Sequence, residues 1–171
     1  DEDEIKQGLG YAVLTRTLQA IKAFIKYYDP SITDDVVNVF SEMVQETYKR
    51  FGIDFNTDFT HFTSADYPTL KDVYATVRGK ITSMPEQSRE RDILEHLELK
   101  MRPLIGELRF YFDGTTTITP RSDFIVFNIR ELMNTDSNIR NALFFNVLKY
   151  AWSLTLDVNQ TMAADITGDG N

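Results

Sequence analysis

The chain has 171 residues, a net charge of −8, no cysteine, two histidines and 42% hydrophobic residues. This length and apolar content fit one globular domain with a substantial core. The acidic balance leaves no broad positive field, so we expect no direct nucleic-acid binding through phosphate attraction. The absence of cysteine excludes disulfide scaffolds, thiolate metal sites, iron–sulfur clusters and thiol nucleophiles.

The sequence has no apolar run near the roughly 18–20 residues that a membrane-spanning helix needs, and its acidic first residues are unlike a secretory signal. We therefore expect a soluble segment without membrane insertion. Because the first residue is not Met and the end is polar and rich in glycine, we expect a processed product or a piece of a longer chain.

Apolar residues at steps of three or four predict amphipathic helices over three segments of the first half, residues 5–28, 34–51 and 70–82. Gly8 and Gly10 disfavour helix, so the first of these is expected to fray or to start after residue 5.

Polar side chains are placed to start the second and third helices. Thr33 offers an N-cap to the second, and Thr69 with Asp72 resembles a capping box at the third. Between these helices, residues 53–66 lack a sustained period, which predicts a packed loop.

The second half begins with a helix predicted over residues 88–113, where Pro103 is expected to introduce a kink. The segments 115–118 and 124–129 then predict two short strands. The second is almost continuously apolar, which is typical of a strand buried on both faces. Because the chain offers only one other strand, we expect further strand partners outside it. A last helix is predicted over residues 136–157, and its broad apolar surface predicts deep burial.

These elements predict a mainly α fold of about five helices with one or two short β-strands. The helical domain, with its short strand element at 115–129, is expected to occupy residues 1–157. Residues 158–171 are expected to form a flexible polar tail.

Motif searches give no complete catalytic or metal site. Gly79-Lys80 has Tyr74 and Ile81 where a phosphate-binding loop needs Gly and Ser/Thr. Asp92 and His96 share a helix face at a spacing of four residues, but no second His is near them, and His61 lies between Phe59 and Phe62. We therefore assign no catalytic, cofactor-binding or metal-binding residue.

The last residues offer one calcium-like pattern. The segment 165–171 resembles the opening of a calcium loop but ends before the bidentate Glu at position twelve. A flexible polar terminus is the alternative interpretation, and calcium binding stays open.

Aromatic residues supply the candidate partner-contact set, which consists of Phe55, Phe59, Phe62, Tyr67 and Tyr111. Residues of this kind form either an exposed contact patch or part of the core. Both interpretations stay open at this point.

Four segments follow one another in a familiar order: Tyr67-Pro-Thr-Leu-Lys-Asp72, Gly106-Glu-Leu-Arg-Phe-Tyr-Phe-Asp-Gly114, Phe124-Ile-Val-Phe-Asn-Ile-Arg-Glu-Leu132 and Asn141-Ala-Leu-Phe-Phe-Asn-Val-Leu-Lys-Tyr-Ala-Trp152. Together they resemble the ATPases of conjugation-type type IV secretion, the conjugal transfer ATPases of the TraC/TraE-like, HerA/FtsK-related family. The resemblance covers about residues 1–157 and implies a helical insertion in an interrupted RecA-like motor domain, with 124–129 as a strand of the motor.

The resemblance also implies a setting. The parent chain would be a bacterial ATP hydrolase using ATP and Mg²⁺, forming a hexamer that contacts secretion-channel proteins at the cytoplasmic, inner face of the cell membrane. The family's nucleotide-binding Lys and Ser/Thr and its Asp-Glu pair match no position here, so this segment would hold no cofactor and be inactive alone. The family pattern after residue 161 is not matched.

The expected function is therefore a non-catalytic helical domain that contacts other subunits or channel proteins and couples ATP turnover to transfer of DNA or protein. The alternative is a free-standing soluble helical domain that binds a partner through one amphipathic face. A calcium-dependent surface protein built on the tail is the third possibility considered.

Overall fold

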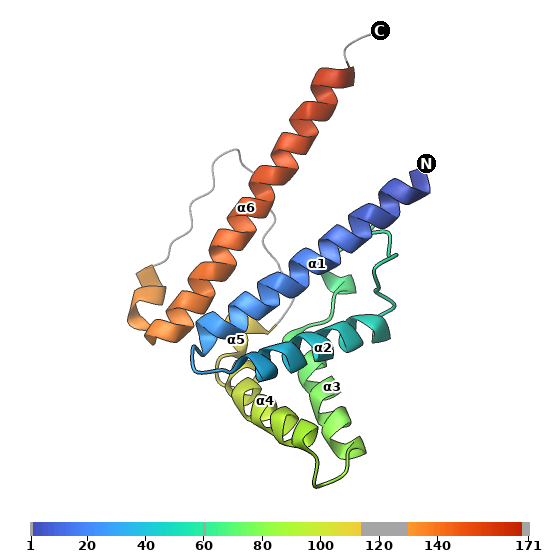
Figure 1. Cartoon of the computed structure of the whole chain (residues 1–171). Helices are drawn as coiled ribbons and strands as arrows, with labels where there is room; N and C mark the ends of the chain where they lie inside the picture. The colour runs from blue at the N-terminus through green and yellow to red at the C-terminus, as the bar shows by residue number, and fades with distance from the viewer. Residues whose placement is uncertain (1, 60, 114–129, 169–171) are drawn as a thin grey trace.

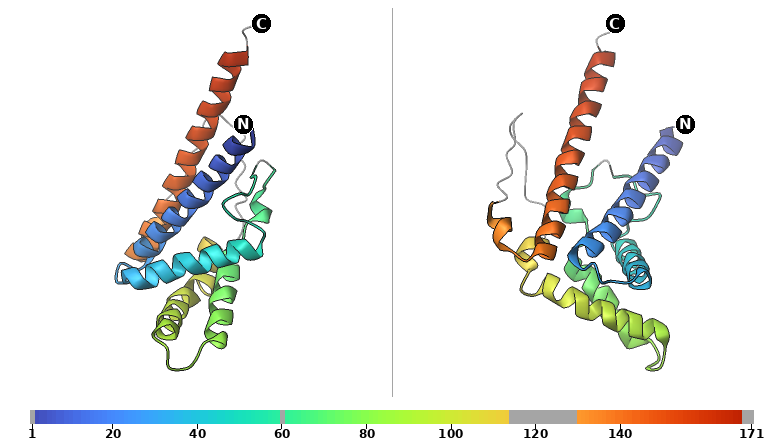
Figure 2. Two further views of the ribbon diagram at one scale, coloured as in Figure 1. Left: turned by 45° about the vertical axis from the view of Figure 1, so that its right-hand side comes forward. Right: turned by 60° about the vertical axis from the view of Figure 1, so that its left-hand side comes forward.

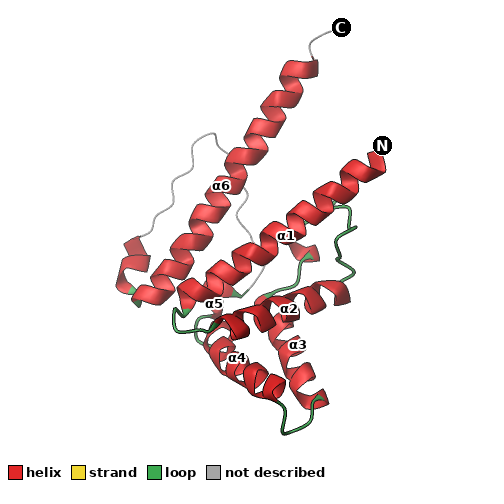
Figure 3. Cartoon of the chain, viewed as in Figure 1, coloured by secondary structure: helices red, strands yellow, loops and turns green. Residues whose placement is uncertain are grey.

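The computed structural model describes residues 2–59, 61–113 and 130–168, and it describes side chains for 10–59, 61–113, 130 and 133–152 (Figure 1). The described part is helical, with short 3₁₀ segments, and contains no strand (Figure 3). In chain order the elements are α1 (Glu2–Tyr28), α2 (Asp34–Arg50), η1 (Ser64–Asp66), α3 (Leu70–Ser83), α4 (Arg89–Ile105), α5 (Arg109–Phe112), η2 (Arg130–Asn134) and α6 (Ser137–Gly168). The two predicted strands, 115–118 and 124–129, lie outside the described residues.

Helices α2, α3 and α4 form one cluster, and α1 and α6 run side by side above it (Figures 1 and 2). Helix α1 contacts both α2 and α6, so it joins the cluster to α6. The N-terminal end of α1 and the C-terminal end of α6 point in the same direction in every view. These two helix ends therefore lie on the same side of the molecule.

The core lies between α1, α2, α3 and α4, where apolar stripes of all four helices meet. Its fully buried side chains include Ile25, Phe40, Val44, Ile53, Val77, Leu94, Leu97, Met101 and Leu104. Apart from Ile53, which lies in the loop after α2, these residues fall on the predicted stripes, so the periodicity of the sequence is confirmed for the helical part of the core.

Helix α1 begins at Glu2, so the prediction of a start after residue 5 is wrong. The reason is a tertiary contact at Gly10. A Cβ there would lie 2.6 Å from the carbonyl oxygen of Thr57, so only glycine lets the loop 53–59 approach the helix backbone. That packing offsets the low helix propensity of glycine.

The predicted starts of α2 and α3 are confirmed, with one difference. Thr33 has the extended backbone of an N-cap, but its hydroxyl donates to the Asp35 carboxylate, and its oxygen accepts no hydrogen bond from the N–H groups of the helix. At α3, the Asp72 carboxylate accepts from the backbone N–H of Thr69 at 2.8 Å and from its hydroxyl at 2.9 Å. The predicted packed loop between them contains η1 as its regular element.

Helix α4 ends at Ile105, whereas the sequence predicted a helix to residue 113 with a kink at Pro103. Gly106 causes the break: its backbone leaves helical geometry, and a Cβ would lie 2.9 Å from the Arg102 carbonyl oxygen. The Leu108 N–H then donates to the Pro103 carbonyl at 2.9 Å, and α5 follows as one separate turn.

Helix α6 begins as predicted, with the Asp136 carboxylate accepting from the Asn138 N–H at 2.8 Å. It continues to Gly168, so the predicted helix end at 157 is wrong. The residues 162–164, Met-Ala-Ala, are strong helix formers, and Gly168 is the first glycine that the helix meets. The division into a domain and a tail at 157 stays a prediction.

Candidate partner-contact surface

Three of the five predicted contact residues come together in the segment before α3. The rings of Phe59 and Phe62 lie 5.0 Å apart edge to face, and Tyr67 lies 6.1 Å from Phe59 and 5.6 Å from Phe62. Tyr67 also approaches Tyr48 of α2 at 6.5 Å. All three are half-buried against the core, so this cluster fixes the loop onto α2.

Burial in this cluster raises the pKa of its two tyrosines. Burial and the neighbouring Tyr67 raise the pKa of Tyr48 to about 12, and burial raises the pKa of Tyr67 as well. Both pKa shifts show that these phenols lie at the edge of an apolar cluster that disfavours their charged form.

The other two predicted residues lie apart from that cluster in their ring contacts. Phe55 pairs with Tyr11 of α1 at 5.2 Å and is half-buried. Tyr111 is exposed and packs its edge on Phe112, whose ring lies 5.4 Å from Phe24 of α1. The five residues therefore do not form one patch, and their contact with a partner stays a prediction.

Sequence reasoning missed a more exposed apolar surface on α6. Phe144, Leu148 and Trp152 are spaced by four residues, which places them on one helix face. Their exposed fractions rise along the helix from 42% to 54% to 67%. We call these three residues the α6 stripe. The signal in the sequence was the breadth of apolar surface on this helix, which was interpreted as deep burial; on this face that interpretation is wrong.

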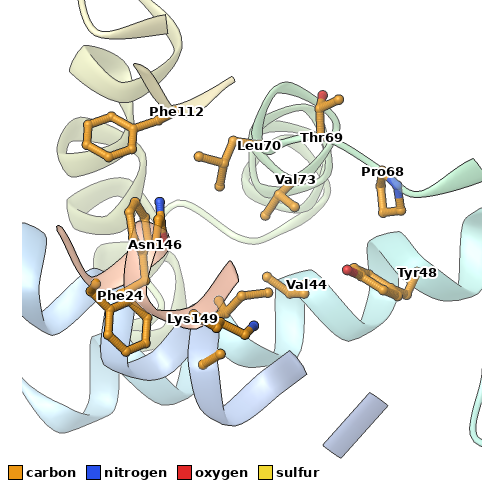
Figure 4. A pocket seen from close by; sticks show the side chains of 13 residues that line it. Phe24, Val44, Tyr48, Pro68, Thr69, Leu70, Val73, Phe112, Asn146 and Lys149 are labelled. Carbon is orange, nitrogen blue, oxygen red and sulfur yellow. The ribbon is translucent and has the colours of Figure 1, made fainter. Parts of the chain in front are cut away.

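A pocket of about 210 Å³ lies between α1, α2, the start of α3 and α6 (Figure 4). Its wall is mostly apolar, and it contains Phe24, Val44, Tyr48, Leu70, Val73, Phe112, Phe145, Asn146 and Lys149 among its residues. The Thr69 hydroxyl at its edge already donates to Asp72. None of its lining residues is acidic.

Lys149 is the cation of this pocket. It is exposed as a residue, but protein around its ammonium lowers its pKa by desolvation, and the positive charge of Arg16 lowers it further. Within the described part of the chain, the ion pairs join other residues, and none includes Lys149. The pocket thus combines apolar walls with an uncompensated positive charge.

The sequence patterns considered for phosphate or metal binding lie in helical surroundings or lack further ligands. Gly79-Lys80 lies inside α3, where the backbone N–H groups belong to the helix and cannot wrap a phosphate. No group of three or more His, Asp or Glu that could hold a metal occurs within the described ranges. Asp165, the first residue of the calcium-like pattern, continues α6 as helix.

A polar cluster at the edge of the core is centred on the buried carboxylate of Glu98, with the half-buried Tyr74 and the exposed Arg102 beside it. Glu98 accepts a hydrogen bond from the Tyr74 hydroxyl and two from Arg102, at 3.0 and 2.7 Å. Each group is partnered, and the cluster ties α3 to α4, so its arrangement is that of a structural ion pair.

The fold and surface thus define a helical domain with an exposed apolar stripe and a small pocket. This chain is similar to part of VirB4 of Thermoanaerobacter pseudethanolicus, with a TM-score of 0.74 and 27% sequence identity. The match covers 82% of this chain and 51% of the VirB4 chain. VirB4 is a type IV secretion ATPase, so the likeness confirms the family resemblance that the sequence motifs predicted. No family model and no curated protein matches the chain.

The chain spans about half the length of that VirB4 structure. No helix in the described ranges is long and apolar enough to cross a bilayer.

Proposed function

We propose that this chain is a non-catalytic helical domain of a type IV secretion ATPase, inserted in a RecA-like motor. The single observation that carries this is the likeness to VirB4 in both fold and sequence. In this proposal the domain contacts neighbouring subunits of a hexamer or proteins of the secretion channel, and it couples ATP turnover to transfer of DNA or protein.

The placement of the chain ends supports an inserted domain. The two terminal helices lie side by side and end on the same side of the molecule, as expected where a domain leaves and re-enters a larger one (Figure 2). The predicted strand at 124–129 would be contributed to the sheet of the motor in this arrangement.

The α6 stripe supports a contact role. Large apolar side chains in a contiguous exposed row are typical of a surface that another protein covers. Here the row lies on the helix that leads out of the domain, so the rest of the ATPase is within reach of it. We place ATP and Mg²⁺ in that remaining part, near the cytoplasmic face of the membrane.

The test compares the 171-residue chain with the complete ATPase that contains it. We expect ATP hydrolysis by the complete protein and none by the chain alone, and we expect a G-x-x-x-x-G-K-[ST] motif before the chain in the parent reading frame. Turnover by the purified chain that survives a mock-purification control would contradict the non-catalytic assignment. A parent without that motif would leave the free-standing binding domain as the function.

A further inference from the structure

The pocket beneath α6 is the second surface that the described chain leaves unused, and its size limits what can enter. A volume of about 210 Å³ is below the roughly 300–1,000 Å³ of small-molecule and cofactor sites. It is above the roughly 150 Å³ that holds a benzene ring in an engineered protein cavity. The pocket therefore suits one aromatic or large aliphatic side chain and is too small for a nucleotide.

The walls of the pocket favour an apolar occupant. Phe24, Val44 and Val73 are buried core residues that form its floor, and Leu70, Phe112 and Phe145 add apolar sides. These residues belong to α1, α2, α3, α5 and α6, so the packing of these helices holds the shape (Figure 4). An entering ring would gain burial without any loop having to move.

The charge at the pocket specifies what should accompany that side chain. Lys149 reaches from α6 to the lined space, and Asn146 lies one turn earlier on the same helix face (Figure 4). Arg16 of α1 is close enough to act electrostatically on Lys149, whereas the pocket lining contributes no carboxylate. On a chain with a net charge of −8, this is a local positive site, and an acidic group from outside would complement it.

We propose that this pocket binds an acidic segment of a partner protein, which inserts one aromatic or large aliphatic side chain between α1, α2 and α6 and places a carboxylate at Lys149. This deepens the proposed function, on which it rests, by giving the chemistry of the partner that the domain contacts. A bulky anchor beside a charge is also the usual form of a small contact that must be specific.

The probe is a capped synthetic peptide, Ac-Ala-Glu-Phe-Glu-Ala-NH₂, added to the 171-residue chain and followed by methyl NMR of Val44, Leu70 and Val73. Two matched peptides carry Ala in place of Phe or Gln in place of both Glu residues. We expect a dissociation constant of about 0.1–1 mM for the first peptide, since one anchor and one charge must offset the cost of ordering it. Each matched peptide should bind about tenfold more weakly.

Two lysine variants assign the charge. Lys149→Gln should weaken the acidic peptide about tenfold and leave the Gln peptide unchanged, which isolates the pairwise interaction. Lys22→Gln is the control, because Lys22 lies on α1 outside the pocket and donates to Asn38 at 3.0 Å. It should change neither peptide.

A third variant fills the pocket. Ala20→Leu adds three carbon atoms to the wall and should abolish the methyl shifts while circular dichroism shows an intact fold. If that variant does not fold, the Lys149→Gln comparison still decides the proposal, because Lys149 is exposed and is not part of the core.

Three results would overturn the proposal. The first is the absence of shifts at the three methyl-bearing residues at about millimolar peptide. The second is binding of 3-phenylpropanoate as tight as the peptide, which would make the site one for small carboxylates. The third is a complete ATPase that does not respond to the peptide while the isolated chain does, because a segment of the same protein would then occupy the pocket. None of these measurements uses ATP, so their failure leaves the test of the proposed function untouched.

Discussion

In the cluster of α2, α3 and α4, the large apolar side chains of the facing stripes are removed from solvent, whereas on α6 three of them lie at the surface. Phe40 and Leu97 have no exposed area, while Trp152 keeps 67% of its own. Both regions carry apolar residues at helical spacing in the sequence, and on α6 these residues spread around more of the helix. The two regions differ in how much of this apolar surface the described chain covers.

The chain thus combines a core whose apolar side chains are buried with a helix that exposes part of its apolar surface. The cluster has three helices that cover one another, with α1 as a fourth side. Helix α6 has α1 along one face and η2 near its start, so another face stays open. The chain spans about half of the VirB4 structure that it resembles. A contiguous exposed apolar face of this kind is typical of a surface that another element or protein covers.

Loss of a buried ring from the core should change the free energy of unfolding the most. Phe40→Ala removes a fully buried ring and should lower the free energy of unfolding by about 3–5 kcal/mol, measured by urea denaturation. Phe144→Ala makes the same chemical change on the α6 stripe and should cost below about 1 kcal/mol. Equal losses at both positions would show that Phe144 is as well covered in solution as Phe40.

The next effect concerns two glycines in helices. Gly10→Ala would place a Cβ 2.6 Å from the Thr57 carbonyl oxygen, so the loop must move, and we expect a loss of about 2 kcal/mol in thermal or urea unfolding. Gly79→Ala is the matched control. An added Cβ there would meet no atom within 4 Å beyond the neighbouring backbone of α3, and helix propensity predicts a gain of up to about 1 kcal/mol. A gain at both sites would mean that the contact at Gly10 is not maintained in solution.

The sequence predicted those parts of the fold that local rules control. Periodicity located the stripes of α2, α3 and α4, and the Thr69 and Asp72 pair located the start of α3. It failed where contacts distant in sequence decide: Gly10 weakens a helix locally, but the loop carrying Thr57 makes glycine the best residue there. Gly106 ended α4 because of backbone geometry that composition does not reveal.

The candidate site was less predictable than the fold. Aromatic content identified Phe59, Phe62 and Tyr67, but it could not distinguish a cluster that fixes a loop from one that faces a partner. The pocket escaped prediction entirely, because its walls come from five helices and Lys149 is one lysine among many in the sequence. The α6 stripe was recognised as apolar but assigned to the interior, since periodicity gives no information on which partner covers a face.

The third effect is smaller and depends on pH. Burial raises the pKa of Glu98, but the hydrogen bonds from Arg102 and Tyr74 outweigh it, so the pKa lies below the ordinary 4.5. A lowered folded-state pKa contributes stability above that value and loses it as pH falls through the folded pKa. Glu98→Gln should therefore cost about 1–2 kcal/mol at pH 7, with the difference from the unaltered chain shrinking in acid below 4.5.

The control for this prediction is Glu46→Gln, which removes a surface pair of Glu46 with Arg50 and should cost at most about 0.5 kcal/mol. Unfolding free energies from pH 7 down into acid give both values. A difference at Glu98 that grows as the pH falls would have the wrong sign and would exclude a stabilising charge at this position.

Two leucine variants with little expected effect on stability separate simple exposure from a contact role. Leu148 on α6 and Leu99 on α4 are both 54% exposed, so replacing either with Gln should change the free energy of unfolding by no more than about 0.5 kcal/mol. The two differ in surroundings, because Leu148 lies in the α6 stripe while Leu99 is flanked on α4 by the exposed polar side chains of Glu95, His96 and Arg102. In the complete ATPase proposed above, Leu148→Gln should therefore lower ATP turnover or subunit assembly, and Leu99→Gln should leave both unchanged. Equal behaviour of the two variants there, despite equal stability, would mean that exposure alone does not make the α6 stripe a contact surface.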